Sequence, residues 1–289
     1  MKLNKLAVFF LVLAGILLFP LSSVSGSSSK SNEKDIVVLS KDNTVVLSGK
    51  VSGDSVGAVM LKVKELNRIH FSSKKPIYLF LNTPGGEIES GLEMLESLRG
   101  SIRRVDTITI FSASMGFQIV QNLGERLIVK NGIMMSHRAA GEISGYFGGQ
   151  APSQMDSRYN LWLSRIKEMD QQTVSRTYGK QTLESYQKSY ADELWLTGNQ
   201  SVEQGYSDRL VVVRCDSSLD GVTTHTINFL GLMVDYDLDN CPLNTSPMNI
   251  HVQLSPEEKT PMTVEKVKEV EAHFIEQYIH NQRSVVPMY

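Results

Sequence analysis

The sequence predicts an α/β domain with a mostly parallel sheet, followed by a smaller C-terminal appendage. Strand-like and helix-like segments alternate between residues 36 and 215, as they do in sheets joined by crossover helices. The alternation stops at Cys215, and residues 216–289 are rich in turn formers with one amphipathic helix. The 289 residues are 41% hydrophobic, which is enough to bury one large core.

Residues 1–26 have the pattern of a secretory signal peptide. Lys2 and Lys5 precede an uncharged apolar run from Leu6 to Leu21, and small residues follow it. The run is short for a membrane span, which needs about 20 apolar residues. We expect a cleaved signal and a periplasmic or secreted protein, with an uncleaved membrane anchor as the alternative. Residues 27–35 are rich in serine and charge and are expected to form a linker.

The expected elements of the domain alternate along the chain. The first half has strands at 36–39, 45–47, 77–81, 107–111, 126–129 and 133–135, with helices capped by Asp54, over 88–98, and from Ser114 to Gly124. The second half has helices over 152–178, from Thr182, and from Thr197 to Gly205, then a strand at 210–213. The appendage has a strand at 224–230 and a helix over 261–280.

Charge and cysteine content limit the possible partners. Lysine and arginine number 29 against 31 acidic residues, so no strong field favours nucleic acid as a partner. Cys215 and Cys241 are the two cysteines, and in an exported protein they suggest one disulfide, with two buried thiols as the alternative. No histidine stands at ligand spacing from either cysteine, so we expect no metal site and no cofactor.

Three features at strand ends suit acyl transfer. The turn Pro84-Gly85-Gly86 precedes a helix, and its backbone N–H groups could hold an oxyanion, although a plain turn has the same pattern. Ser114 stands between a strand and a helix, where it is either an exposed nucleophile or an N-cap. His137 ends an apolar strand, where it is either a base for the serine or a structural histidine.

A histidine base needs a third group that fixes its tautomer. Asp192 and Glu193 are the candidates, just before the apolar segment that starts at Leu194. Adjacent side chains of an extended segment point in opposite directions, so only one of the two could face His137. Both could equally be solvated surface acids.

The order of these features resembles the Clp protease proteolytic subunit and its relatives in the crotonase-like fold, a superhelix of repeated β-β-α units. The resemblance covers roughly Val45 to Val213. The matching stretches are Ile77 to Gly86, Ser112 to Gly116, Ile133 to His137, Trp195 to Thr197, and Glu203 to Asp208.

The resemblance implies roles for single residues. Ser114 would be the nucleophile, His137 the general base, and the N–H groups of Gly86 and Met115 the oxyanion hole. The third residue of the family is usually aspartate, and the matching position holds Glu193, with Asp192 as the fallback.

The resemblance also implies an assembly. Residues 152–189 resemble the family's handle, through which two rings meet, and the glycine-rich loop 141–149 resembles the segment that lines the substrate groove. A homo-oligomeric ring is therefore expected. An exported copy would meet neither ATP nor the unfoldases that serve cytosolic members, so we expect no ATPase partner.

The expected function is an exported, ATP-independent serine endopeptidase that cleaves peptides or unfolded segments through an acyl-enzyme. One alternative is a catalytically inactive ring that serves as a scaffold or binds peptides. A second is a peptidase of the signal-peptide-peptidase type, which pairs serine with lysine. A crotonase-type thioester enzyme is disfavoured, because export removes the coenzyme A pool.

Overall fold

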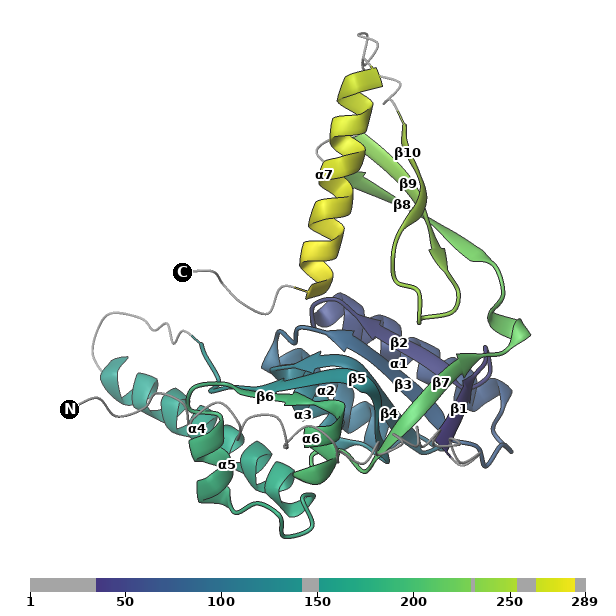
Figure 1. Ribbon diagram of the computed structural model, residues 1–289. Coiled ribbons are helices and arrows are strands. Elements are labelled where there is room, and N and C mark those ends of the chain that lie inside the picture. Colours follow the sequence, from purple (N-terminus) through teal and green to yellow (C-terminus); the bar gives the residue numbers. More distant parts are fainter. Residues whose placement is uncertain (1–34, 142–150, 230–231, 254–263, 284–289) are drawn as a thin grey trace, which may run out of the picture. The chain divides into compact units, whose positions relative to one another are not determined.

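The computed structural model describes residues 35–141, 151–229, 232–253 and 264–283 (Figure 1). The expected signal peptide lies outside the described residues, as do residues 27–34 of the linker and residues 142–149 of the glycine-rich loop. Within the described ranges, no helix is both long and apolar enough to cross a membrane.

A seven-stranded sheet forms the centre of the fold (Figure 1). Along the order β1-β7-β5-β4-β3-β2 every pair is parallel, and β6 pairs antiparallel with β5. The strands are β1 (Ile36–Leu39), β2 (Thr44–Ser48), β3 (Ile77–Thr83), β4 (Val105–Ala113), β5 (Arg126–Ser136), β6 (Leu194–Thr197) and β7 (Arg209–Cys215). The predicted α/β class with a mostly parallel sheet is confirmed.

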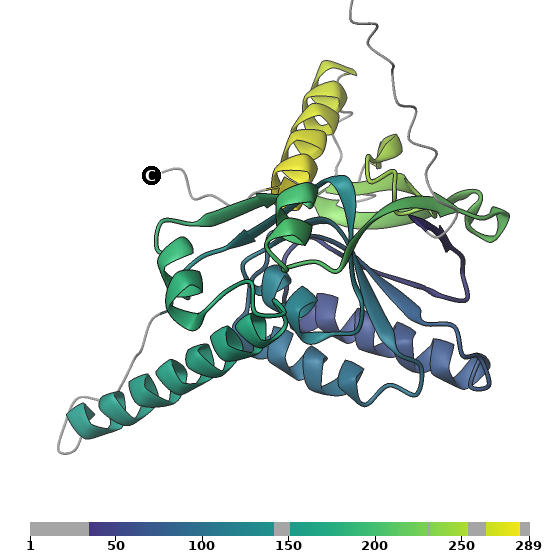
Figure 2. The ribbon, with the colours of Figure 1, turned by 60° about the horizontal axis from the view of Figure 1, so that its bottom comes forward.

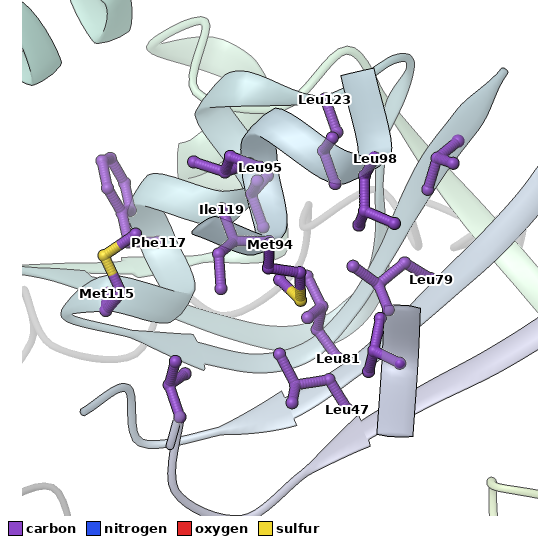
Figure 3. Close-up of a cluster of buried hydrophobic side chains, with 14 of the residues drawn as sticks. Leu47, Leu79, Leu81, Met94, Leu95, Leu98, Met115, Phe117, Ile119 and Leu123 are labelled. Carbon is purple, nitrogen blue, oxygen red and sulfur yellow. The ribbon is translucent and has the colours of Figure 1, made fainter. Parts of the chain in front are cut away.

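Helices connect the strands and bury one face of the sheet. They are α1 (Gly53–Ile69), α2 (Ile88–Arg99), α3 (Met115–Asn122), α4 (Ala151–Ser175), α5 (Leu183–Ser189) and α6 (Gly198–Glu203). Figure 2 shows α1 and α2, in purple and blue, together on one side of the sheet. Leucines of β2 and β3 pack there against apolar side chains of α2 and α3 (Figure 3). This core fixes the start of α3, where the predicted nucleophile lies.

Two local expectations are corrected by the structure. Helix α1 is capped by Ser52 rather than by Asp54, and the Ser55 hydroxyl accepts a hydrogen bond from the Ser52 N–H at 3.0 Å. The two strands expected at 126–129 and 133–135 are one continuous strand, β5. Lys130 and Asn131 are exposed and break the apolar pattern, and the pairing of β5 with β4 shifts register between Ile128 and Ile133, although the strand itself continues.

The appendage contains more strand than expected. Strands β8 (Val222–Phe229), β9 (Leu232–Asp239) and β10 (Met248–Gln253) form an antiparallel sheet in the order β10-β9-β8. Phe274 of helix α7 (Val264–Arg283) packs against Val234 and Tyr236 of β9. Strand β8 confirms the strand expected at 224–230 as far as Phe229, whereas β9 and β10 were not predicted. Aspartates occupy alternate positions of β9, and aspartate is uncommon in strands, so the segment looked like a turn.

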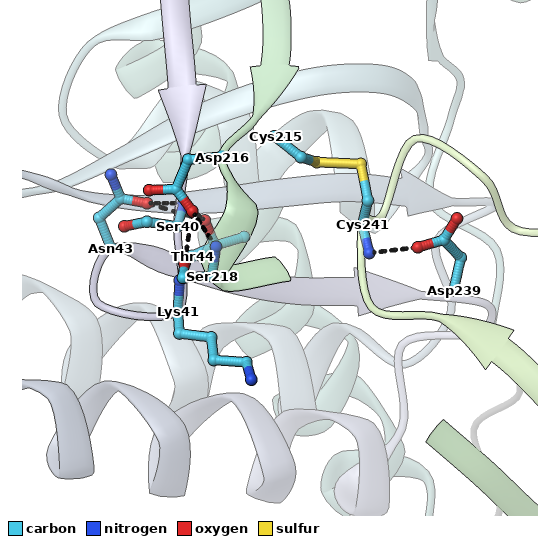
Figure 4. The surroundings of a disulfide bond; sticks show 9 residues. All are labelled: Ser40, Lys41, Asn43, Thr44, Cys215, Asp216, Ser218, Asp239 and Cys241. Carbon is cyan, nitrogen blue, oxygen red and sulfur yellow. Dashed lines mark hydrogen bonds between the residues drawn. A yellow bond between two sulfur atoms is a disulfide. The ribbon is translucent and has the colours of Figure 1, made fainter. Parts of the chain in front are cut away.

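A disulfide joins the end of β7 to the segment after β9 (Figure 4). Cys215 and Cys241 are bonded, with their Cα atoms 5.9 Å apart. The Cys241 N–H donates to Asp239 Oδ1 at 2.9 Å. The bond closes a loop that includes β8 and β9, so it limits how far this part of the chain can separate from the central sheet on unfolding.

Candidate active site

The register of two neighbouring strands brings Ser114 and His137 together. Ala113 of β4 lies opposite Met135 of β5, and the Ser114 N–H donates to the Met135 carbonyl at 2.9 Å. The carboxyl ends of parallel strands share one edge of the sheet, so the next residues of both chains meet there. Ser114 Oγ lies 2.7 Å from His137 Nε2. This is the hydrogen bond that a serine nucleophile needs with its base.

The backbone of Ser114 has an unusual conformation. Its φ is 53° and its ψ is −119°, a combination that non-glycine residues adopt rarely and at a cost in energy. The residue is the N-cap of α3, yet its side chain makes no capping hydrogen bond. The hydroxyl is directed to His137 instead, an arrangement that suits a nucleophile better than a helix cap. A strained strand-to-helix turn exposes the nucleophile's hydroxyl in serine enzymes of the α/β-hydrolase fold.

Two glycines shape the turn beside α3. Gly85 has a φ of 89°, and a Cβ there would lie 2.5 Å from the Ala113 carbonyl and 2.8 Å from the Met115 nitrogen. Gly86 has a φ of 148°, and a Cβ there would lie 2.3 Å from the Val51 carbonyl. No other residue type fits either position without movement of the backbone. The absence of side chains therefore lets this turn lie directly against the N-terminus of α3.

The N–H groups of Gly86 and Met115 are free to donate. Within the described part of the chain, no oxygen accepts a hydrogen bond from either group. Met115 is the first residue of α3, where N–H groups have no intrahelical partner and the helix dipole favours negative charge. Two unused donors near a nucleophile are what an oxyanion hole requires. The roles of Gly86 and Met115 stay predictions, and the geometry suits them.

The structure does not bring either predicted acid into contact with the histidine. Ser136 pairs with Leu194, so the next positions in this register are His137 and Glu193. The Glu193 carboxylate, however, accepts a hydrogen bond from Trp195 Nε1 at 2.9 Å, and Glu193 is exposed with a φ of 68°. Neither Glu193 nor the exposed Asp192 forms an ion pair with His137 within the described residues.

A small cavity of about 40 Å³ lies beside the serine and histidine. The groups around it come from four elements and three connecting segments, and the polar ones are Ser114, Gln118, Ser136, His137, Asp170 and Tyr190. Asp170 is a residue that sequence reasoning missed. It lies on α4 with only 3% of its surface exposed, and the apolar spacing of Trp162, Ile166 and Met169 could have placed it on the same inward face.

A chain of buried hydrogen bonds holds Ser136, the last residue of β5. The hydroxyls of Ser136 and Tyr186 are 2.8 Å apart, and Gln118 Nε2 donates to the Tyr186 hydroxyl at 3.4 Å. Thr173 donates in turn to Gln118 Oε1 at 3.2 Å. Burial raises the pKa of the Tyr186 hydroxyl, which keeps it protonated and able to donate. These bonds link α3, α4, α5 and β5, and so hold the residue next to His137 in place.

A larger cleft of about 500 Å³ lies between the start of α2 and the helix α4. Gly86 is at its edge, and its apolar walls are Ile88, Tyr159, Trp162, Leu163 and Ile166. Glu87 and Glu89 also line it. The cleft offers an apolar side chain of a bound peptide a place beside the turn that would hold the oxyanion.

Comparison with known proteins decides the family. The sequence model of the Clp protease family matches residues 27–214. The chain belongs to the Clp protease family. As a Clp protease it is placed among the serine peptidases, which are hydrolases, and in a family that forms homo-oligomeric rings.

Curated relatives agree with this Clp protease assignment. Two ATP-dependent Clp protease proteolytic subunits of Streptococcus pneumoniae, from strains P1031 and Hungary19A-6, are each 27% identical over 179 residues. The alignments cover 60% of this chain and 86% of each relative. The similarity therefore spans most of these subunits, and the family model ends at residue 214, before the appendage.

Proposed function

We propose that this Clp protease is a serine endopeptidase in which Ser114 is the nucleophile and His137 the general base. The 2.7 Å contact between Ser114 Oγ and His137 Nε2 carries the proposal. His137 takes the hydroxyl proton as Oγ bonds to the peptide carbonyl carbon, and the N–H groups of Gly86 and Met115 hold the oxyanion. The protonated ring then gives its proton to the leaving amine, and water releases the acyl group by the reverse sequence.

The substrates that suit this site are peptides and unfolded segments with an apolar side chain before the scissile bond. The cleft beside Gly86 supports this proposal, because Trp162 and Ile166 of α4 and Ile88 of α2 line it. Removal of an apolar side chain from water contributes roughly 1.5–3 kcal/mol. Glu87 and Glu89 at the same cleft would repel an acidic side chain.

The protein is proposed to work outside the cytoplasm, as a ring and without an ATPase partner. The Cys215–Cys241 disulfide supports an oxidising compartment, as does the apolar segment that follows Lys5. Compartments of this kind offer no ATP. Helix α4 supports the ring, because its large apolar side chains Met155, Tyr159, Leu161 and Leu163 are each at least 40% exposed in the single chain.

Neither alternative function accounts for the site as well. A serine–lysine peptidase needs an amine beside the serine, and no lysine is among the described residues that line the cavity or the cleft. An inactive scaffold has no use for the strained backbone of Ser114 or for its contact with His137.

The first prediction concerns cleavage by the purified full-length chain without nucleotide. Fluorogenic peptides that differ only in the residue before the scissile bond, leucine or glutamate, are compared after removal of ATP with apyrase. We expect hydrolysis of the leucine peptide, with a kcat/KM at least about ten times that of the glutamate peptide, because a pocket contact of this kind discriminates roughly 10- to 200-fold. Hydrolysis that requires ATP, or no hydrolysis of any peptide, would contradict the proposal.

A further inference from the structure

Within the described residues, one ring nitrogen of His137, Nδ1, has no hydrogen-bond partner. His137 Nε2 contacts Ser114 Oγ, so in the neutral ring that accepts the serine proton the hydrogen must sit on Nδ1. Within the described residues, the ion pair between a histidine and a carboxylate is that of His70 with Asp42, remote from this site in the fold. An Nδ1–H group that orients a catalytic ring needs an acceptor.

Asp170 is the carboxylate that shares a cavity with His137. It lines the cavity of about 40 Å³ together with Ser114, Ser136 and Tyr190. One water molecule needs roughly 15 Å³ of such space and two to four polar partners, so the cavity has both the room and the partners for one. Asp192 and Glu193 do not line this cavity, and both are exposed.

Two donors hold the Asp170 carboxylate in a fixed orientation. The Tyr190 hydroxyl donates to Asp170 Oδ2 at 2.7 Å, and Gln187 Nε2 donates to the same oxygen at 2.9 Å. Burial, together with the neighbouring carboxylate, raises the pKa of the Tyr190 hydroxyl, so it stays a donor. Both bonds use Oδ2. Among the described residues no donor is bonded to Oδ1, so this oxygen is left for a group within the cavity.

We propose that Asp170 is a positioning residue for His137 and acts through a water molecule in their shared cavity. The water accepts a hydrogen bond from His137 Nδ1–H and donates one to Asp170 Oδ1. When Ser114 loses its proton to Nε2, the carboxylate stabilises the positive ring. Only the serine proton moves, and the step needs no other reactant. The inference rests on the proposed function, because it assigns a partner to the proposed base.

Other charged groups near the ring come from two further places. Arg138 follows His137 directly, and its charge partly opposes the rise that burial and Asp170 cause in the pKa of Tyr190. Glu193 stands opposite His137 in the strand register, with its carboxylate bonded to Trp195. Asp170 is distinct from these groups because it is buried and lines the cavity. Buried charges interact more strongly than exposed ones, since water screens them less.

The test compares two Asp→Asn substitutions on the same helix. D170N removes the proposed charge and nearly keeps the shape, and D156N is the matched control because Asp156 is exposed on α4. We expect kcat/KM of D170N to fall about 100-fold, less than the ~10⁴-fold lost when a directly bonded aspartate of a triad is replaced by asparagine. D156N should stay within threefold of the wild type.

The pH profile separates positioning from a structural role. The acidic limb of kcat/KM reports protonation of the base in the free enzyme. A carboxylate favours the protonated ring, so its loss in D170N should move that limb to lower pH. D170E keeps the charge and should keep the wild-type limb even if its rate falls, while E193Q should leave the limb unmoved.

Two results would overturn the role of Asp170. One is an active wild type with D170N at wild-type activity. The other is a slow D170N enzyme whose acidic limb of kcat/KM lies at the same pH as in the wild type and in D170E. A wild-type protein that is inert towards peptides and towards a fluorophosphonate would overturn the proposed function itself, so the two failures can be told apart.

Discussion

Replacement of Ser114 by alanine is expected to lower kcat/KM for peptide hydrolysis by roughly 10⁵-fold or more, which places the variant at the detection limit. The loss is this large because the acyl-enzyme forms on Ser114 Oγ, and alanine has no atom that could replace it. Measured KM for any residual activity should change little, since the apolar cleft beside Gly86 is intact in the variant.

Ser112 provides the matched control for this substitution. It lies two residues earlier on β4, is buried, and its hydroxyl has no hydrogen-bond partner within the described residues. S112A therefore removes the same kind of atom two residues away, from β4, without touching the site, and its activity should stay within a few-fold of the wild type. If S114A kept activity while S112A lost it, the nucleophile would have been assigned to the wrong serine.

Replacement of His137 by glutamine is expected to lower kcat/KM by roughly 10⁴- to 10⁶-fold. Glutamine can hydrogen-bond to Ser114 but cannot take its proton at neutral pH, so the hydroxyl stays a weak nucleophile. The acidic limb of the pH profile should disappear from whatever activity remains. Steady-state kinetics from pH 5 to 9 would measure both effects.

His70→Gln is the control for the histidine substitution. His70 forms an ion pair with Asp42 at 3.2 Å and takes no part in the site, so H70Q should keep the wild-type rate and pH profile. A serine–lysine mechanism would give another pattern. H137Q would then remain active, and the loss would follow substitution of a lysine such as Lys167 on α4.

The sequence was sufficient to predict where the serine and the histidine lie. Both residues directly follow apolar runs, and the carboxyl ends of neighbouring parallel strands meet at one edge of a sheet. The alternation of strands and helices between residues 36 and 215 likewise predicted the class of fold. These inferences depend on the backbone pattern, which hydrophobic periodicity reports directly.

The third residue of the site could not be predicted in the same way. The strand register does place Glu193 opposite His137, but the direction of its carboxylate depends on a positive φ and on the hydrogen bond from Trp195. Asp170 approaches the site from helix α4, and helix α5 lies between it and Glu193 along the chain. Which side chains converge on a cavity depends on how α4 packs, and periodicity within one segment does not report it.

Mapping the adduct of a fluorophosphonate on the wild-type protein tests the assignment of the nucleophile most directly. The purified full-length chain is labelled, digested and analysed by mass spectrometry, with H137Q labelled in parallel. We predict one adduct, on Ser114, that forms with the same pH dependence as peptide hydrolysis and at least about 10³-fold more slowly in H137Q. An adduct on another residue, or equal labelling rates in wild type and H137Q, would contradict a mechanism in which His137 activates Ser114.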